Sequence, residues 1–214
     1  MRRAALLIVV AFGLLVLTGI VAVNSLNVVQ RVTFIDHMRG VVEAKEPDRR
    51  DFRPLTGEAR VLAGTELRTS KESGALLHWA DGSRLEAGAN TTLTVLQCRL
   101  DKRTKSSVSL FKLDVGQIFV HVMKALSASS KFEVRTPTAT AGVRGTEFSV
   151  RVTPGGATDV LVYEGNVAVT SGGKQLGVAQ GQVCSVAPAG SATGLRELRD
   201  GERKAWKQST AAGE

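Results

Sequence analysis

The sequence predicts an all-β fold, an antiparallel β-sandwich or β-roll, preceded by one N-terminal transmembrane helix. Two patterns after residue 32 predict the β class: short apolar and polar alternation broken by glycine, and strand-length apolar segments recurring roughly every ten residues. No strong amphipathic helix lies between these segments. A separate apolar run near the N-terminus predicts the helix.

Length and composition limit the architecture. The chain has 214 residues, of which 43% are hydrophobic and 22% charged. This size allows one ordinary domain with an appendage, or two small domains, and the apolar content excludes a wholly disordered protein. The formal net charge is +8, and residues 1–31 contribute three basic residues and no acidic one.

The N-terminal run extends from Ala4 to Val23 and is uncharged. Twenty helical residues rise about 30 Å, enough to cross the apolar core of a bilayer. Arg2 and Arg3 precede the run, so the positive-inside rule predicts a single-pass protein with a cytoplasmic stub at residues 1–3 and a signal anchor at residues 4–25. The rest of the chain is then periplasmic or otherwise extracytoplasmic.

A cleaved secretory signal is the alternative to an anchor. Such signals have apolar regions of roughly 7 to 15 residues and a small-x-small cleavage site. The run here is longer, and Val23-Asn24-Ser25 matches that site poorly. Either interpretation exports the remaining chain.

The exported part divides into three sections. We expect a linker at residues 26–39, a β domain at residues 40–190 and a basic C-terminal tail at residues 191–214. Residues 43–58 are charged and contain two prolines, which predicts an exposed connection. The tail carries apolar positions among many charges between Leu195 and Lys207, enough for one short helix.

Within the β domain, three segments have clear strand patterns. Residues 75–85 predict a hairpin, because Asp81-Gly82 supplies the positive φ of a tight turn. Residues 116–122 place Ile118, Val120 and Val122 on one face of a strand. Residues 159–169 predict a second hairpin around Glu164-Gly165-Asn166.

A short repeat predicts a two-fold duplicated unit. Gly64-Thr65-Glu66-Leu67 recurs 81 residues later as Gly145-Thr146-Glu147-Phe148. If this reflects duplication, residues 61–96 and 142–180 follow the same path. Chance matches between glycine-rich turns are the alternative.

The two cysteines, Cys98 and Cys184, allow two interpretations. In an oxidising compartment a disulfide between them would stabilise the fold by a few kcal/mol. Two free, buried thiols are the alternative. The sequence has no CxxC motif and its histidines, His37, His78 and His121, are scattered, so we expect no metal site and no cofactor.

The most specific segment is Phe132-Glu133-Val134-Arg135-Thr136-Pro137-Thr138-Ala139-Thr140-Ala141-Gly142-Val143-Arg144-Gly145-Thr146-Glu147-Phe148-Ser149-Val150. It resembles the signature of FecR domains, in which a strand ends in Thr-Pro and is followed by Val-Arg-Gly-Thr-x-Phe-x-Val. The motif residues are Thr136, Pro137, Gly142, Val143, Arg144, Gly145, Thr146 and Phe148. The resemblance implies a β-rich extracytoplasmic domain; the family's namesake is a membrane regulator that signals to a cytoplasmic sigma factor.

Backbone chemistry gives this motif a structural interpretation. Pro137 lacks an amide hydrogen, so the strand from Phe132 ends there. Gly142 and Gly145 permit a tight reversal. Arg144 either ties down loop carbonyls or pairs with a carboxylate such as Glu147 or Glu164, or it contacts an anionic ligand.

These observations predict a non-catalytic sensing or binding module for a protein partner in the membrane or envelope. A structural or assembly subunit of a membrane or envelope complex is the alternative. The chain has no GxSxG nucleophile motif, and we expect no enzyme activity. Three residues before the span are too few to bind a sigma factor, which argues against direct sigma-factor contact.

Basic residues cluster at two places, around a predicted hairpin end (Arg99, Lys102, Arg103, Lys105) and in the tail (Arg196, Arg199, Arg203, Lys204, Lys207). Export excludes nucleic acid as a partner. Anionic lipid or an acidic cell-wall polymer suits these charges, and a solvated surface that aids solubility is the alternative.

Overall fold

The computed structural model describes residues 27–123, 127, 129–188 and 192–211. The predicted stub and the whole of the predicted anchor, at residues 4–25, lie outside this part of the chain. Within the described residues, no helix combines the length and the apolar character needed to cross a membrane.

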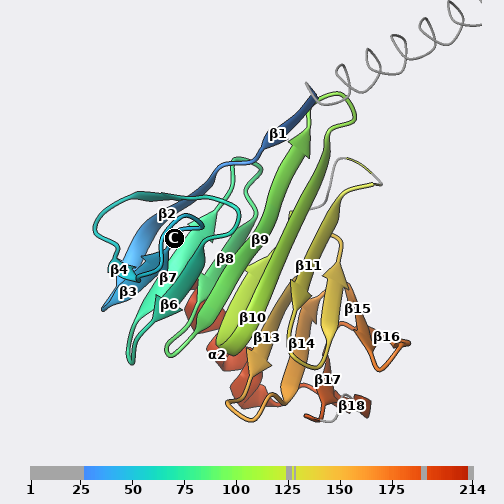
Figure 1. The fold of residues 1–214 in the computed structure, drawn as a ribbon. Coiled ribbons are helices and arrows are strands. Elements are labelled where there is room, and N and C mark those ends of the chain that lie inside the picture. The colour runs from blue at the N-terminus through green and yellow to red at the C-terminus, as the bar shows by residue number, and fades with distance from the viewer. Residues whose placement is uncertain (1–26, 124–126, 128, 189–191, 212–214) are drawn as a thin grey trace, which may run out of the picture.

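The all-β prediction is confirmed for the described residues, in which eighteen strands form two sheets and one helix follows them (Figure 1). Sheet A runs in the order β4-β3-β6-β9-β10-β11-β12-β15-β16. Strand β1 pairs with the last three residues of β9, Arg99 to Asp101. The strands of sheet A are β1 (Val28–Gln30), β3 (Val42–Lys45), β4 (Arg53–Pro54), β6 (Glu66–Thr69), β9 (Thr92–Asp101), β11 (Lys131–Arg135), β12 (Thr140–Val143), β15 (Asn166–Ser171) and β16 (Lys174–Ala179).

Sheet B runs in the order β5-β2-β7-β8-β10-β13-β14-β17-β18. Its strands are β2 (Thr33–Arg39), β5 (Ala59–Val61), β7 (Gly74–His78), β8 (Arg84–Ala87), β13 (Glu147–Val152), β14 (Thr158–Glu164), β17 (Gln182–Val186) and β18 (Ala192–Glu197). Among the described strands, all pairs are antiparallel except β10–β11.

Strand β10 (Ser106–His121) belongs to both sheets. Its first part, to Val115, pairs with β9 in sheet A, and its second part, from Gly116, pairs with β8 and β13 in sheet B. Figure 1 shows β9 and β10 side by side along the length of the molecule. The sandwich is therefore continuous through one long strand.

The core lies between the sheets. Trp79 of the β7–β8 turn contacts Phe111 and Phe132 of sheet A edge-on, with ring centroids 5.7 and 6.2 Å apart. Its indole N–H donates to Thr33 Oγ1 over 2.8 Å, so this buried polar group has a partner. The inward positions Phe148, Val150 and Val152 of β13 are all buried.

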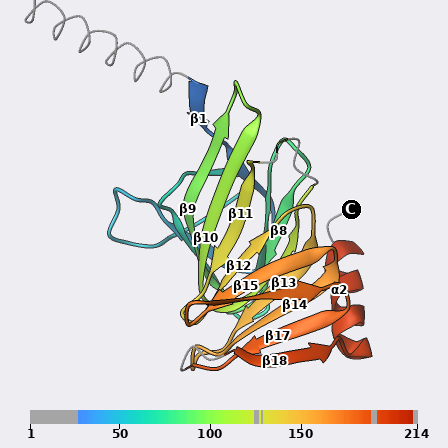
Figure 2. The ribbon, with the colours of Figure 1, turned by 90° about the vertical axis from the view of Figure 1, so that its right-hand side faces the viewer.

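Helix α2 (Asp200–Ala211) covers the outer face of sheet B (Figure 2). Leu198, just before it, packs with Leu161 and Val183, and Tyr163 lies against them. The tail prediction was thus partly right: the helix exists, but it starts after β18, because residues 192–197 pair with β17.

Two boundary predictions were wrong. The expected linker at residues 26–39 contains β1 and β2, and Thr33 and Ile35 of β2 are fully buried. The β domain therefore begins before residue 40 and continues past residue 190. The expected exposed connection at 43–58 is mostly exposed, including the two-residue strand β4, but its first residues belong to β3, where Ala44 is buried.

The hairpin predicted at 75–85 is confirmed as β7–β8, but the one predicted at 159–169 is wrong. Strand β14 pairs with β13 and β17 in sheet B, whereas β15 pairs with β12 and β16 in sheet A. The chain changes sheets at Gly165 instead of reversing within one sheet. An added Cβ there would lie 2.8 Å from Thr146 Cγ2, so this crossing packs tightly.

The two-fold repeat is also wrong. Its matched segments start at β6, which pairs with β3 and β9 in sheet A, and at β13, which pairs with β10 and β14 in sheet B. The shared Gly-Thr-Glu sequence reflects similar strand starts in different sheets.

Candidate functional site

The first half of the FecR-like motif forms a hydrogen-bonded turn. Strand β11 ends at Arg135, as the following Thr136-Pro137 predicts. Thr136 Oγ1 accepts hydrogen bonds from the Ala139 amide, at 2.9 Å, and from the Thr158 hydroxyl, at 2.9 Å. Thr136 therefore has a structural role.

The second half of the motif carries the chain from one sheet to the other. Gly142 and Val143 end β12 in sheet A, and β13 begins at Glu147 in sheet B. The expected tight reversal is thus a crossing between sheets, with Gly145 at a φ of 58°. Thr146 is buried in this crossing, and its carbonyl accepts from the Val122 amide over 3.0 Å.

Arg144 is exposed at this crossing. It forms no hydrogen bond or ion pair with any residue that the structure describes. Its expected partner Glu147 lies instead against His121, with Glu147 Oε1 2.5 Å from His121 Nδ1. The structure thus provides no salt bridge that would explain an arginine here.

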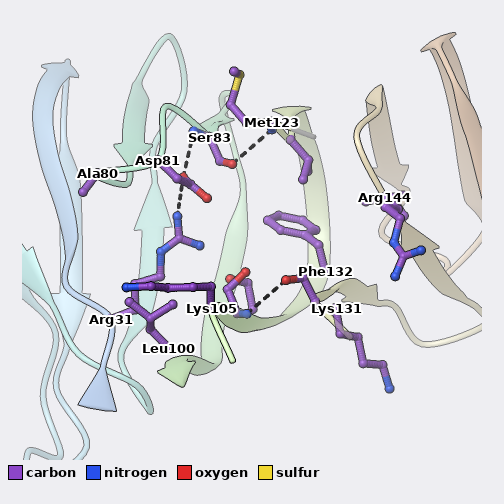
Figure 3. Close-up of a pocket in the computed structure, with 15 residues that line it drawn as sticks. Arg31, Ala80, Asp81, Ser83, Leu100, Lys105, Met123, Lys131, Phe132 and Arg144 are labelled. Atoms are coloured by element: carbon purple, nitrogen blue, oxygen red, sulfur yellow. Dashed lines mark hydrogen bonds and ion pairs between the residues drawn. The ribbon is translucent and has the colours of Figure 1, made fainter. Parts of the chain in front are cut away.

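A cavity of about 510 Å³ is lined by Arg144 and by residues of both sheets (Figure 3). Sheet A contributes Leu100 and Phe132, and sheet B contributes the β7–β8 turn with Asp81. A second, shallower hollow of about 480 Å³ lies on the other side of the crossing. Val143 and Arg144 line both, so the motif forms the wall between them.

The charges of the first cavity are mainly positive. Four of its fifteen lining residues are basic and one is acidic. Arg31 pairs with Asp81, and Lys131 Nζ lies 2.7 Å from Glu133 Oε1. Lys105, like Arg144, has no ion-pair or hydrogen-bond partner among the described residues.

Hydroxyl groups complete the lining. Ser107 and Ser109 lie on the face of β10 that also carries Phe111 and Leu113. The inward face of this strand therefore changes from apolar to polar as it reaches the cavity. This change was visible in the sequence, and it is the signal that could have predicted a cavity here.

The sequence identified only part of this site. Arg144 and Val143 belong to the motif, and Lys105 belongs to the basic cluster at the predicted hairpin end, which the structure places at the β9–β10 turn. Arg31 and the apolar lining were missed, because they come from segments far apart in the chain. Thr136 and Pro137 lie at the other end of β11, outside the cavity lining.

The cysteines lie in different sheets, Cys98 in β9 and Cys184 in β17. Both thiols are free and buried, so the structure agrees with the alternative of two free thiols and not with a disulfide between them. Burial raises the pKa of each thiol, which favours the unreactive protonated form. In the described part of the chain, no three His, Cys, Asp or Glu side chains are grouped to hold a metal ion.

Comparison with solved structures supports the fold. Two crystal structures of a protein from Parabacteroides distasonis ATCC 8503, provisionally described as an anti-sigma factor, superpose with TM-scores of 0.53 and 0.54 at 21% and 20% identity. Each match covers 67% of this chain and 64% of the other. The chain therefore spans less than two thirds of those relatives, and the likeness establishes the fold alone.

Comparison with curated proteins gives no match. Comparison with family models gives one, described as FecR protein, over residues 65–168. The matched region runs from the start of β6 into β15 and includes both halves of the motif. The chain therefore contains a FecR domain at residues 65–168.

Proposed function

We propose that this chain is a membrane-tethered, extracytoplasmic signalling module that binds a protein partner in the membrane or envelope and catalyses no reaction. The observation that carries the proposal is Arg144, an exposed arginine of the family motif that has no partner within the described residues. Exposed arginines are frequent anchors of protein interfaces, because one guanidinium offers several directed hydrogen bonds.

The position of this site supports the proposal. Lys102 donates its amide hydrogen to Asn27 O over 2.9 Å, so the chain enters the domain beside the β9–β10 turn. The same end holds the cavity and Arg144 (Figure 3). A partner bound there would lie next to the segment that leads to the predicted anchor, where binding can influence a membrane helix.

The family and the provisional description of the structural neighbours support a regulatory role. Signalling proteins act through reversible contacts with other proteins, and such contacts need an accessible surface with unpaired polar groups. The open end of this sandwich has such groups.

Co-purification tests the proposal. Full-length chain would be extracted from cells in mild detergent, together with Arg144→Gln and with Lys174→Gln as a matched control on the distant β15–β16 turn. We expect one partner to co-purify with the parent chain and with Lys174→Gln, and to be lost with Arg144→Gln.

Equal recovery of the partner with all three chains would contradict the proposal that it binds at Arg144. Recovery of several membrane proteins at fixed stoichiometry, unaffected by Arg144→Gln, would instead support the assembly-subunit alternative.

A further inference from the structure

We propose that the cavity between the sheets binds a small organic anion with an apolar body, such as a carboxylate or a phosphate monoester that carries a short alkyl group. This inference rests on the proposed function, because it names a ligand for the same end of the domain. It adds a small-molecule signal to a module that binds a protein.

The volume of the cavity fits such a ligand. Small-molecule pockets have volumes of about 300 to 1,000 Å³, and this one has about 510 Å³. It is a hollow between two sheets, which suits a compact molecule better than a folded partner.

Apolar groups form the inner part of the cavity. The Phe132 ring projects into it from β11, as Figure 3 shows, Leu100 and Val143 line it from β9 and β12, and Val122 lines it from just after β10. Phe132 is 6% exposed and Val143 is 9% exposed, so both present small apolar surfaces toward the hollow. An apolar body placed there would be removed from water.

Positive groups lie around the apolar part. The Arg31 side chain is only 11% exposed, pairs with Asp81 and lies over the Trp79 ring, with 5.6 Å from its Cζ to the ring centroid. A guanidinium has five N–H donors, and one carboxylate uses only some of them. A buried arginine with spare donors beside a hollow favours an anion in that hollow.

Two exposed cations extend this positive field to the opening. Lys105 and Arg144 line the cavity and have no ion-pair partner among the described residues. A divalent cation is disfavoured, because only one lining residue is acidic and it already pairs with Arg31. Ser107 and Ser109 add hydroxyls that can donate to the anionic head.

Titration calorimetry on the full-length chain in nanodiscs of phosphatidylcholine tests the inference. Hexanoate and hexyl phosphate are the probes. Hexanol supplies the apolar body without the charge, and acetate and inorganic phosphate supply the charge without the body. We expect saturable binding of at least one probe, and weaker binding of all three controls.

The variant for this test is Lys105→Gln with Arg144→Gln, and the matched control is Lys71→Gln with Lys174→Gln, at two exposed positions outside the lining. We expect the first pair to weaken probe binding about tenfold or more, as loss of charge-assisted hydrogen bonds does. The control pair should leave the affinity unchanged.

Preference for hexanoate or for hexyl phosphate identifies the head group, and either supports the inference. It is overturned if the parent chain binds neither probe, if acetate or phosphate binds as well as its alkyl form, or if both variant pairs behave alike. If the probes do not bind but co-purification of the protein partner still depends on Arg144, the ligand inference fails and the proposed function stands.

Discussion

Arg144 and Thr136 belong to one motif but have different surroundings. Thr136 Oγ1 accepts two backbone amide hydrogens, from Thr138 at 3.4 Å and from Ala139 at 2.9 Å. Arg144 has no partner among the described residues and is exposed. The first residue therefore stabilises a turn, and the second is available for binding.

This contrast gives a prediction for stability. Thr136→Val should lower the free energy of unfolding by about 1 to 3 kcal/mol, because part-buried amides lose their acceptor. Arg144→Gln should change it by less than about 0.5 kcal/mol, as surface substitutions without special contacts do. Urea denaturation measures both. Equal destabilisation by the two variants would mean that Arg144 also has a structural role.

At the scale of elements, β10 holds the sandwich together by changing sheets at Gly116. The φ of Gly116 is 100°, and an added Cβ would lie 2.5 Å from Thr91 Cα and 2.8 Å from Asn90 O. Neither backbone atom can move without disturbing the adjoining hydrogen bonds between Thr91 and Gln117.

Gly116→Ala should therefore destabilise the domain by about 2 to 4 kcal/mol, because backbone strain and steric overlap add. Thermal unfolding followed by circular dichroism measures this loss. Gly177→Ala, in edge strand β16 where an added Cβ meets nothing within 4 Å, is the matched control and should have little effect. A stable Gly116→Ala protein would show that the change of sheet does not depend on this glycine.

Helix α2 is fixed to sheet B through Glu202. Arg196 of β18 donates to both carboxylate oxygens, over 2.9 and 2.7 Å, and the Arg199 amide also donates, over 2.9 Å. The Arg196 hydrogen bonds, with further support from the Arg199 amide, lower the pKa of Glu202 from 4.5 to about 2. The Glu202 carboxylate, at the third position of the helix, also accepts the amide hydrogen of Arg199 just before the helix, which is one of the two hydrogen bonds of a capping box.

The low pKa of Glu202 predicts that the free energy of unfolding depends on pH. Because the pKa is lower in the folded state than in the unfolded state, the stabilisation from the ionised carboxylate is complete above about pH 5 and is lost as the pH falls toward 2. Glu202→Gln should cost about 1 to 3 kcal/mol at pH 7, with the difference from the parent chain shrinking on acidification. Urea denaturation between pH 7 and about 2.5 measures this. The control is Glu72→Gln, whose parent side chain is 86% exposed; its free energy of unfolding should match that of the parent chain at every pH. A loss of stability in Glu202→Gln that does not change with pH would contradict the ion pair between Glu202 and Arg196.

The sequence predicted strands better than their pairing. Alternation at Val160, Val162, Val167 and Val169 identified β14 and β15 correctly, but not that they lie in different sheets. A period of two continues unchanged through a crossing, because both sheets bury their inward faces in the same core. Pairing is decided by contacts distant in sequence, which local patterns do not contain.

At the scale of the whole molecule, the cavity could not be predicted from the sequence for the same reason. It combines Arg31, the β7–β8 turn, the β9–β10 turn and the motif crossing, all from distant parts of the chain. The motif was found because it is contiguous. The shared strand β10 then brings these segments to one end of the sandwich, beside the place where the chain enters at β1.

Photo-crosslinking in intact cells tests most directly whether this end of the domain binds a partner. A photoreactive amino acid would replace Lys131, which lines the cavity together with Arg144, in one full-length chain, and Lys174, at the start of β16, in another, so that Arg144 stays in place. We predict a discrete crosslinked protein from position 131 and none from position 174. Crosslinking only from position 174, or from neither position, would contradict binding at this end of the domain.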